Sequence, residues 1–237
     1  MKIRSSLFLH AALVAALTLP ALASAQEDVI RKNLAARVTT LTDIDEISKT
    51  PMPGLYEVRM GTDIFYTDAK GDFIIQGNLL DTQARKNLTE ERVSKLTAID
   101  FASLPAKNAF TIVRGNGKRK LAVFEDPNCG YCKRFEKELK KVDNVTVQLF
   151  LIPILGDDSV VKARQIWCSA DQGKTWMDWM VDGIAPKGKP TCNTDVLTAN
   201  VEFAKKHRIT GTPTLVFADG TRVPGAIDAQ QIEQKLK

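Results

Sequence analysis

The chain has 237 residues, and its 33 Lys and Arg residues against 28 Asp and Glu residues give a formal net charge of +5 at pH 7. This mild excess of positive charge does not indicate a nucleic-acid-binding protein, because an ordinary solvated surface explains such an excess. The length allows one large domain, or an ordinary domain with a small one beside it.

The first 25 residues have the pattern of a secretory signal peptide. Lys2 and Arg4 precede an apolar run over 7–22, and Ala23-Ser24-Ala25 is a cleavage motif, so we expect cleavage after Ala25. The run is too short for a permanent span and no later segment is apolar enough, so no membrane insertion is expected. Without this leader, 31 basic residues face 28 acidic ones, a net charge of +3. The mature protein should lie outside the cytoplasm, where disulfides form.

Residues 26–87 are expected to form a small α+β unit. Apolar residues at helical spacing predict an amphipathic helix over 27–38, and Gly61-Thr62-Asp63 has the composition of a hairpin turn. Short strands are predicted around and after this turn, at 55–60, 64–67 and 73–76. These elements bury little surface alone, so the unit should pack against the rest of the chain or dimerise.

A second helix is predicted over residues 88–104 and is interpreted as a linker. Thr89 is the expected N-cap, and two glutamates follow it in the first turn, where acidic residues are favoured. Pro105 and its polar neighbours should end the helix. Residues 105–237 are then left for a larger domain.

The stretch 122–135 predicts a short apolar strand, a tight turn and a helix that begins at two cysteines. The predicted buried face of this helix carries Tyr131, Phe135, Leu139 and Val142, which recur at helical spacing. Cys129 lies at or just before the first turn, where free N–H groups and the positive end of the dipole stabilise an anion. Cys132 follows three residues later, close enough to form a disulfide with Cys129.

This arrangement predicts thiol–disulfide exchange. A thiol at a helix start titrates below its ordinary pKa of about 8.5, and Lys133 and Arg134 add positive charge, so Cys129 should be an ionised, accessible attacking group. Cys132, further inside the helix, is the expected resolving thiol. For an isolated Cys-x-x-Cys a zinc site or a static disulfide is the alternative, but the preceding strand and turn favour redox chemistry. No cofactor and no metal are expected.

The remaining elements continue an α/β pattern. A strand at 145–152 has little polarity, which is typical of the centre of a sheet. Residues 157–206 have helical patterns and contain Trp167, Trp176 and Trp179. These tryptophans are interpreted as packing around Cys168 rather than lining a ligand groove. A hairpin turn at Asp219-Gly220 and a closing helix over 229–236 complete the chain.

Cys168 and Cys192 stand apart from the Cys-x-x-Cys pair and from each other, without the spacing of zinc ligands. They are interpreted as one structural disulfide, which would stabilise the fold by about 3 kcal/mol. A second redox pair is the alternative.

Pro213 opens an apolar strand, where it cannot donate a hydrogen bond to a sheet ladder, so it marks an edge or a special turn. A trans peptide bond is the default. A cis bond there would leave the backbone of Thr212 free to pair with an extended peptide lying across the Cys129 site.

Cys129-Gly130-Tyr131-Cys132 and Thr212-Pro213, in this order with a helical insertion between them, resemble the thioredoxin superfamily. The leader, the small N-terminal unit, the linker helix and the later cysteine pair extend the resemblance to the periplasmic thiol:disulfide isomerases of the DsbC/DsbG family. The resemblance implies an α/β fold, a thioredoxin-like domain with a helical insertion, preceded by a small α+β dimerisation domain and a linker helix. It also implies a homodimer joined through the N-terminal domains.

By this resemblance, the protein reduces and isomerises incorrect disulfides in periplasmic client proteins and has chaperone activity. Cys129 would attack, Cys132 would resolve, and the Thr212-Pro213 bond would be cis. The residues implied to contact the client are Gly130, Tyr131, Thr212 and Pro213. Cys168 and Cys192 would be the family's structural disulfide, and a membrane-bound thiol reductase would keep the site reduced.

The chain departs from thioredoxin at one position. Thioredoxin has a buried acid six residues before its first cysteine, and Val123 occupies that place here. The proton acceptor for Cys132 is therefore open, with Glu125 as one candidate.

The residues also bear on other functions. DsbG-type proteins, which reduce oxidised single cysteines, carry Cys-Pro-Tyr-Cys and lack the extra cysteine pair, so Gly130 and Cys168 favour the isomerase. A holdase chaperone with secondary cysteines is the alternative from another class. A cysteine protease needs a histidine beside its thiol, and the mature chain has only His207, at the end of a basic helix.

Overall fold

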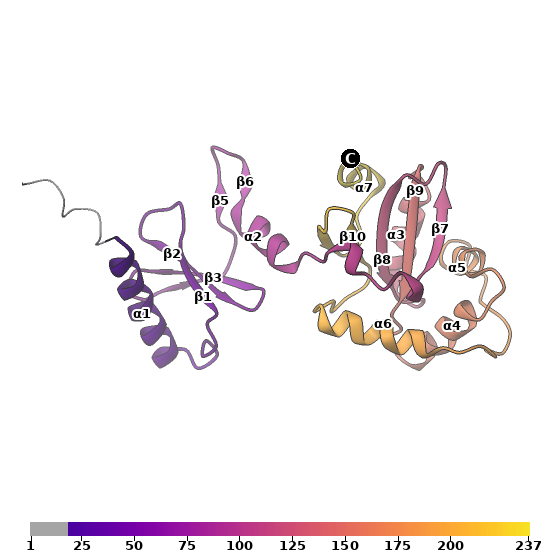
Figure 1. Cartoon of the computed structure of the whole chain (residues 1–237), viewed down its shortest axis with the longest axis horizontal. Helices are drawn as coiled ribbons and strands as arrows, with labels where there is room; N and C mark the ends of the chain where they lie inside the picture. Colours follow the sequence, from indigo (N-terminus) through magenta and orange to yellow (C-terminus); the bar gives the residue numbers. More distant parts are fainter. Residues whose placement is uncertain (1–18) are drawn as a thin grey trace, which may run out of the picture. The chain divides into compact units, whose positions relative to one another are not determined.

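The computed structural model describes residues 19–237, and the first 18 residues of the predicted leader lie outside the described part. The first helix begins at Leu19, so it includes the last residues of that leader. The chain divides into two compact units, with the boundary between Val93 and Ser94 (Figure 1). No helix within residues 19–237 combines the length and the apolar character needed to cross a bilayer.

The first unit contains a long helix, a four-stranded antiparallel sheet and a small two-stranded ladder. The elements are α1 (Leu19–Arg37), β1 (Glu46–Lys49), β2 (Leu55–Met60), β3 (Asp63–Asp68), β4 (Ile74–Ile75), β5 (Leu80–Asp81) and β6 (Lys86–Asn87). The sheet order is β1-β2-β3-β4, and β5 pairs with β6. The predicted hairpin is present: Met60 pairs with Asp63, and Gly61 takes a φ of +61°, which glycine adopts without steric cost.

The core of this unit is small. Ile30 and Leu34 of α1 pack against three buried residues, Ile44, Ile47 and Val58. β1, β5 and β6 were not predicted from the sequence. They are two to four residues long and partly polar, so they have no alternating apolar pattern of their own. They form because they pair with neighbouring strands in the folded unit.

α2 (Leu88–Thr97) begins at the start of the predicted linker helix but ends at Thr97 rather than at 104. A short 3-10 turn, Phe101–Ser103, follows. The carboxylate of Asp100 accepts a hydrogen bond from the backbone N–H of Ala102 at 3.0 Å and so caps this turn. Because Asp100 caps a separate turn, the helix ends before Pro105, which was expected to end it.

The start of α2 also differs from the prediction, because Thr89 is not its cap. The side chain of Asn87 accepts a hydrogen bond from the backbone N–H of Glu90 at 3.1 Å. Thr89 is buried, accepts from the backbone N–H of Leu79 at 2.8 Å and bonds with the hydroxyl of Tyr66. The threonine thus fastens the helix to the sheet of the first unit.

The second unit is built around a five-stranded sheet in the order β11-β10-β8-β9-β7. Its strands are β7 (Phe110–Arg114), β8 (Arg119–Glu125), β9 (Val145–Leu151), β10 (Thr214–Phe217) and β11 (Arg222–Pro224). Its helices are α3 (Gly130–Leu139), α4 (Asp157–Trp167), α5 (Gln172–Met180), α6 (Asp195–Lys206) and α7 (Ala229–Lys235). β8 and β9 are parallel and the other pairs antiparallel, so the α/β class holds.

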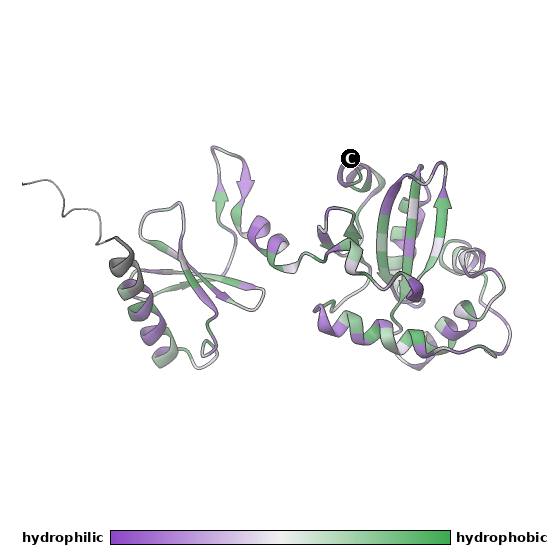
Figure 2. Ribbon diagram, in the orientation of Figure 1, coloured by the Kyte–Doolittle hydropathy of each residue, from purple (hydrophilic) through white to green (hydrophobic). Residues whose placement is uncertain are grey.

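Helices cover both faces of this sheet. On one face, with α3 and α7, the cluster includes Leu121, Val123, Phe135, Leu139 and Ile232. On the other face, with α6, the cluster includes Ala122, Phe124, Val201, Phe203 and Ala204. In Figure 2, α6 alternates green and purple along its length, as expected of a helix with one covered face. Successive residues of β8 alternate between faces, so Glu125, at its end, lies on the α3 face.

Candidate active site

Cys129 lies between the end of β8 and the start of α3. It is the N-cap of α3, and its Sγ accepts a hydrogen bond from the backbone N–H of Cys132 at 3.1 Å. The predicted position at the helix start is therefore correct. The free N–H groups of the first turn point toward the sulfur, which favours its ionised form.

Asp126 holds the turn before Cys129, a role that the sequence analysis missed. Its buried carboxylate accepts hydrogen bonds from the backbone N–H groups of Asn128 at 2.7 Å, Ile154 at 2.7 Å and Leu155 at 2.9 Å. The hydroxyl of Ser159 donates to it at 2.7 Å. One side chain thereby ties the cysteine turn to the segment that leads into α4.

The Thr212–Pro213 peptide bond is cis and lies beside Cys129. The thiol of Cys129 donates a hydrogen bond to the carbonyl oxygen of Thr212 at 3.3 Å. The carbonyl of Pro213 accepts from the backbone N–H of Gly225 at 2.8 Å, which fixes the start of β10. Two segments 83 residues apart in sequence thus meet at one sulfur atom.

The surroundings of Cys129 lower the pKa of its thiol to about 6. The largest contribution is the hydrogen bond with the Cys132 thiol, which lowers the pKa. Burial raises it, and hydrogen bonds with Thr212 and with backbone N–H groups lower it further. The charges of Lys133 and Arg134 were expected to assist. Instead, Lys133 lies 3.6 Å from the ring centre of Trp179 and Arg134 lies 5.3 Å from that of Tyr131.

Cys132 has the opposite character. It is fully buried on the inner face of α3, and burial raises the pKa of its thiol far above the ordinary range. The hydrogen bond to Cys129 and the nearby carboxyl of Glu125 act in the same direction. Within one turn of helix, one thiol is acidic and the other holds its proton.

The expectation of a freely accessible Cys129 is wrong, because this residue is only 4% exposed. The Thr212–Pro213 segment lies against its sulfur and covers it from one side. The rim around it is open: Gly130 and Tyr131 are exposed, and a Cβ added at Gly130 would meet no atom within 4 Å. The exposed surface next to the Cys129 turn is therefore that of Gly130 and Tyr131.

Two buried carboxyl groups lie below the cysteines, and the sequence analysis named only one of them. Glu125 ends β8, and Glu136 lies one turn after Cys132 on the same face of α3. Both are 0% exposed. Burial, followed by the charge of Glu136, raises the pKa of Glu125 well above its usual value. The spacing of four residues from Cys132 was the available signal for Glu136.

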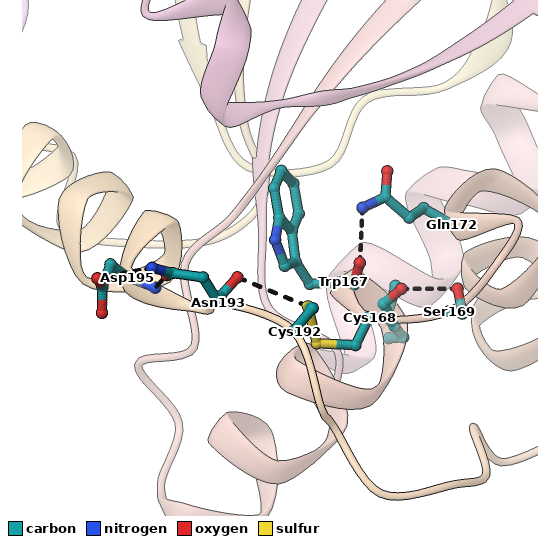
Figure 3. The surroundings of a disulfide bond; sticks show 8 residues. Trp167, Cys168, Ser169, Gln172, Cys192, Asn193 and Asp195 are labelled. Atoms are coloured by element: carbon teal, nitrogen blue, oxygen red, sulfur yellow. Dashed lines mark hydrogen bonds between the residues drawn. A yellow bond between two sulfur atoms is a disulfide. The ribbon is translucent and has the colours of Figure 1, made fainter.

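Cys168 and Cys192 form a disulfide with a Cα–Cα distance of 5.5 Å (Figure 3). It joins the end of α4 to the segment before α6 and encloses α5. Trp167 lies beside this disulfide in Figure 3. The other two tryptophans pack near the cysteine pair instead: Trp176 Nε1 donates to Glu136 Oε1 at 2.8 Å and Trp179 Nε1 to the Pro127 carbonyl at 2.6 Å.

No group of three or more His, Cys, Asp or Glu side chains suited to a metal ion occurs among residues 19–237. The chemistry that the site can perform is that of its two free thiols. An acidic thiol attacks a disulfide, and a neighbouring buried thiol displaces the product.

Comparison with known families gives two matches along the chain. Residues 106–237 match the model of a thioredoxin-like domain, and residues 21–90 match the N-terminal domain of disulfide bond isomerase proteins. Together they account for the two units and agree with the fold expected from the sequence. The second match also assigns the small sheet of the first unit to a known domain.

Individual relatives agree with these matches. A probable thiol:disulfide interchange protein DsbC of Bordetella pertussis is 41% identical over 212 residues, covering 89% of this chain and 74% of the relative. The thiol:disulfide interchange protein DsbC of Escherichia coli is 27% identical over 222 residues, covering 90% and 89%. Among solved structures, a disulfide interchange protein from Neisseria gonorrhoeae is 40% identical. It covers 55% of this chain and 94% of its own, with a TM-score of 0.53.

Proposed function

The chain belongs to the DsbC family of thiol:disulfide interchange proteins, and from this premise we propose that Cys129 is its attacking thiol and Cys132 its resolving thiol. The observation that carries this assignment is the pKa of about 6 at Cys129 beside the raised pKa of Cys132. At neutral pH the first thiol is ionised and the second is not, so the two roles are separated before any client binds.

In the proposed reaction, the Cys129 thiolate attacks one sulfur of a client disulfide. A bond forms between Cys129 and that sulfur, and the other client sulfur leaves as a thiolate. The freed client thiolate can then attack a different disulfide of the client and release Cys129 unchanged, which is isomerisation. Alternatively, Cys132 attacks Cys129, the client leaves reduced, and the Cys129–Cys132 pair is oxidised.

Client binding is assigned to Gly130, Tyr131, Thr212 and Pro213. Tyr131 is 65% exposed, and Ile154 and Leu155, 41% and 55% exposed, follow the strand that neighbours the cysteine turn. These apolar side chains suit the unfolded segments that carry incorrect disulfides and support a chaperone activity. The backbone of Thr212 lies next to the sulfur of Cys129, and an extended client peptide would pair with it there.

The protein is proposed to act as a homodimer joined through the first unit, with 26–87 as dimerisation domain, 88–104 as linker and 105–237 as catalytic domain. In support, Phe73, Ile75 and Leu80 of the first unit are 74%, 54% and 59% exposed, although its own core is small. Large exposed apolar side chains in so small a unit are typical of an interface.

The mature protein is placed in the periplasm, after cleavage following Ala25. Its clients there are misoxidised proteins, and a membrane-bound thiol reductase keeps Cys129 and Cys132 reduced. The disulfide between Cys168 and Cys192 supports an oxidising compartment, since such bonds rarely persist in the cytosol. No nucleic acid is among the proposed partners.

Refolding of a scrambled multi-disulfide protein in a glutathione buffer tests this function. Wild type should restore native pairing, whereas Cys129→Ala should lose this activity, because the attacking sulfur is absent. Cys132→Ala should retain part of the isomerisation, since the client thiolate can release Cys129, but should lose net reduction of the client.

The outcomes separate the alternatives. Reduction of sulfenylated single cysteines without recovery of native disulfides would favour a DsbG-type reductase. Suppression of aggregation that survives in Cys129→Ala, with no exchange activity in wild type, would favour a holdase. Equal refolding yields with wild type and Cys129→Ala would contradict the proposal.

A further inference from the structure

The resolving step requires Cys132 to lose a proton, and this thiol is not exposed to solvent. Cys132 is 0% exposed and lies between α3 and the sheet, in a cluster with Leu149, Leu151 and Trp176. Burial raises the pKa of this thiol, so spontaneous ionisation at neutral pH is rare. A nearby group must take the proton while Cys132 attacks.

The end of β8 supplies such a group. Glu125 is paired in register with Leu151 of β9, and its side chain lies on the α3 face, next to Cys132. Both of its carboxyl oxygens are buried without a hydrogen-bond partner. An uncompensated buried carboxyl is costly to a fold, so its presence beside Cys132 points to a functional role.

Glu136 lies beside Glu125 but has partners of its own. Its Oε1 accepts a hydrogen bond from Trp176 Nε1 at 2.8 Å, and Arg114 Nη2 lies 3.8 Å from its Oε2. The two carboxyls are therefore unequal. The indole and the guanidinium stabilise negative charge on Glu136, whereas Glu125 has neither, so Glu125 is the carboxyl that is disposed to take up a proton.

We propose that Glu125 is the group that exchanges a proton with Cys132, and that Glu136 positions and tunes it. This inference rests on the exchange function proposed above. When Cys132 Sγ attacks Cys129 Sγ, the bond between the two cysteines forms and the client sulfur leaves as a thiolate. The proton of Cys132 passes to the Glu125 carboxylate.

The reverse step uses the same group as an acid. When a reducing thiolate attacks Cys129, the Cys129–Cys132 bond breaks and Cys132 departs with the electron pair. The protonated carboxyl of Glu125 then returns the proton to Cys132. The redox change is confined to the sulfur atoms, and Glu125 returns to its starting state after each cycle of oxidation and reduction.

The acidity of Glu125 suits this exchange. An ordinary carboxylate is a poor base toward a thiol, because their pKa values differ by about four units. Burial and the charge of Glu136 raise the pKa of Glu125 well above its usual value, which makes Glu125 a stronger base than an ordinary carboxylate. The ionisable groups that face it are Cys129 at the N-cap of α3 and Cys132 and Glu136 within α3, with Arg114 of β7 behind Glu136.

The resolving step can be measured alone by mixing the reduced protein with oxidised glutathione. The first step, formation of the Cys129–glutathione mixed disulfide, depends on glutathione concentration, and the second, intramolecular step does not. Acid quenching and mass spectrometry separate the reduced, mixed and oxidised species at each time. We expect Glu125→Gln to slow the intramolecular step at least tenfold at pH 7 and to change the first step less than threefold.

The pH profile distinguishes proton transfer from altered packing. In wild type the intramolecular rate should rise to a plateau at the pKa of Glu125. In Glu125→Gln this plateau should be lost, and the rate should rise about tenfold per pH unit as solvent base takes over. Glu125→Asp should restore part of the plateau. Glu136→Gln should move the inflection to lower pH, because the charge that raises the pKa of Glu125 is removed.

A stability measurement excludes misfolding as the cause of a slower step. The folded carboxyl of Glu125 keeps a proton that the unfolded one loses, so wild type loses stability as pH rises above the usual glutamate pKa. Glu125→Gln does not titrate, so its urea midpoint should exceed that of wild type increasingly from pH 5 to pH 8. A variant that is more stable and yet slower cannot be slow because it is unfolded. Glu202→Gln, on the exposed side of α6, is the matched control and should change neither quantity.

The results separate failure of this inference from failure of the proposed function. If Cys129 forms no mixed disulfide with glutathione, the exchange function itself fails. If the mixed disulfide forms normally and Glu125→Gln resolves it at the wild-type rate at every pH, the function stands and the role of Glu125 is rejected. A less stable Glu125→Gln protein that loses both steps equally would also reject it.

Discussion

Cys129 and Cys132 are three residues apart in the chain and have opposite acidities. The first is an N-cap that receives hydrogen bonds from its own helix, and the second is buried where its charge would be unfavourable. The sequence predicted the acidic thiol, because helix starts stabilise anions, and it placed Cys132 further inside the helix, but the raised pKa of Cys132 is a finding of the structure. It could not predict that Lys133 lies over the ring of Trp179 and Arg134 over the ring of Tyr131. The first contact depends on the position of α5, and the second depends on the rotamer of Tyr131.

Alkylation by iodoacetamide should show the acidity of Cys129 directly. Because its pKa is lowered to about 6, the rate should rise from pH 4 and level off above pH 7, where the thiolate form is nearly complete. Rapid quenching and mass spectrometry of the reduced protein give the profile. Cys132→Ala is the informative comparison. This substitution removes the thiol whose hydrogen bond lowers the pKa of Cys129 most, so the midpoint of the alkylation profile should move to higher pH. A wild-type midpoint at 8.5 or above would contradict the mechanism.

At the scale of elements, periodic patterns predicted the helices well and their ends poorly. α3 was expected from the spacing of Tyr131, Phe135 and Leu139, but Tyr131 is 65% exposed and Glu136 is buried instead. The buried face of α3 consists of Cys132, Phe135, Glu136 and Leu139, and Tyr131 lies outside that face. The meeting of Glu125 and Glu136 could not be predicted, because it depends on how β8 and α3 are placed against each other.

The disulfide that encloses α5 has a predictable energetic effect. Replacing both Cys168 and Cys192 by Ala removes a constraint across 24 residues and should lower the free energy of unfolding by about 3 kcal/mol. Urea unfolding of both proteins in the Cys129→Ala background measures this without interference from the reactive pair. In excess reductant that opens the bond, the difference between the two proteins should disappear. A loss of less than about 1 kcal/mol would show that the bond adds little to this insertion.

At the scale of the whole molecule, each of the two units has its own buried cluster. The second unit contains three clusters around its sheet, whereas the first has one small cluster and several exposed apolar side chains. The sequence predicted this imbalance from the length of residues 26–87. It did not reveal the four-stranded order of the small sheet, since β1 has no pattern of its own.

Deletion of residues 26–87 from the mature protein should convert a dimer into a monomer. The exposed side chains Phe73, Ile75 and Leu80 are lost with this segment, and with them the surface proposed to join two copies. Light scattering at several concentrations measures the mass of both proteins, and Cys129→Ala, which leaves the first unit intact, should stay dimeric. The truncated protein should still form a mixed disulfide with glutathione. A full-length monomer would reject the proposed assembly.

The indole of Trp176 gives this molecule a built-in optical signal. It is fully buried, bonds to Glu136 and meets the ring of Phe110 edge-on at 6.3 Å, so its orientation is fixed. Light emission from such an indole responds to a change of charge a few ångströms away, and in the proposed exchange that change occurs on Glu125, which lies next to the Glu136 carboxyl that bonds to the indole. Native fluorescence can therefore follow each oxidation and reduction cycle in real time, with no dye attached to the protein.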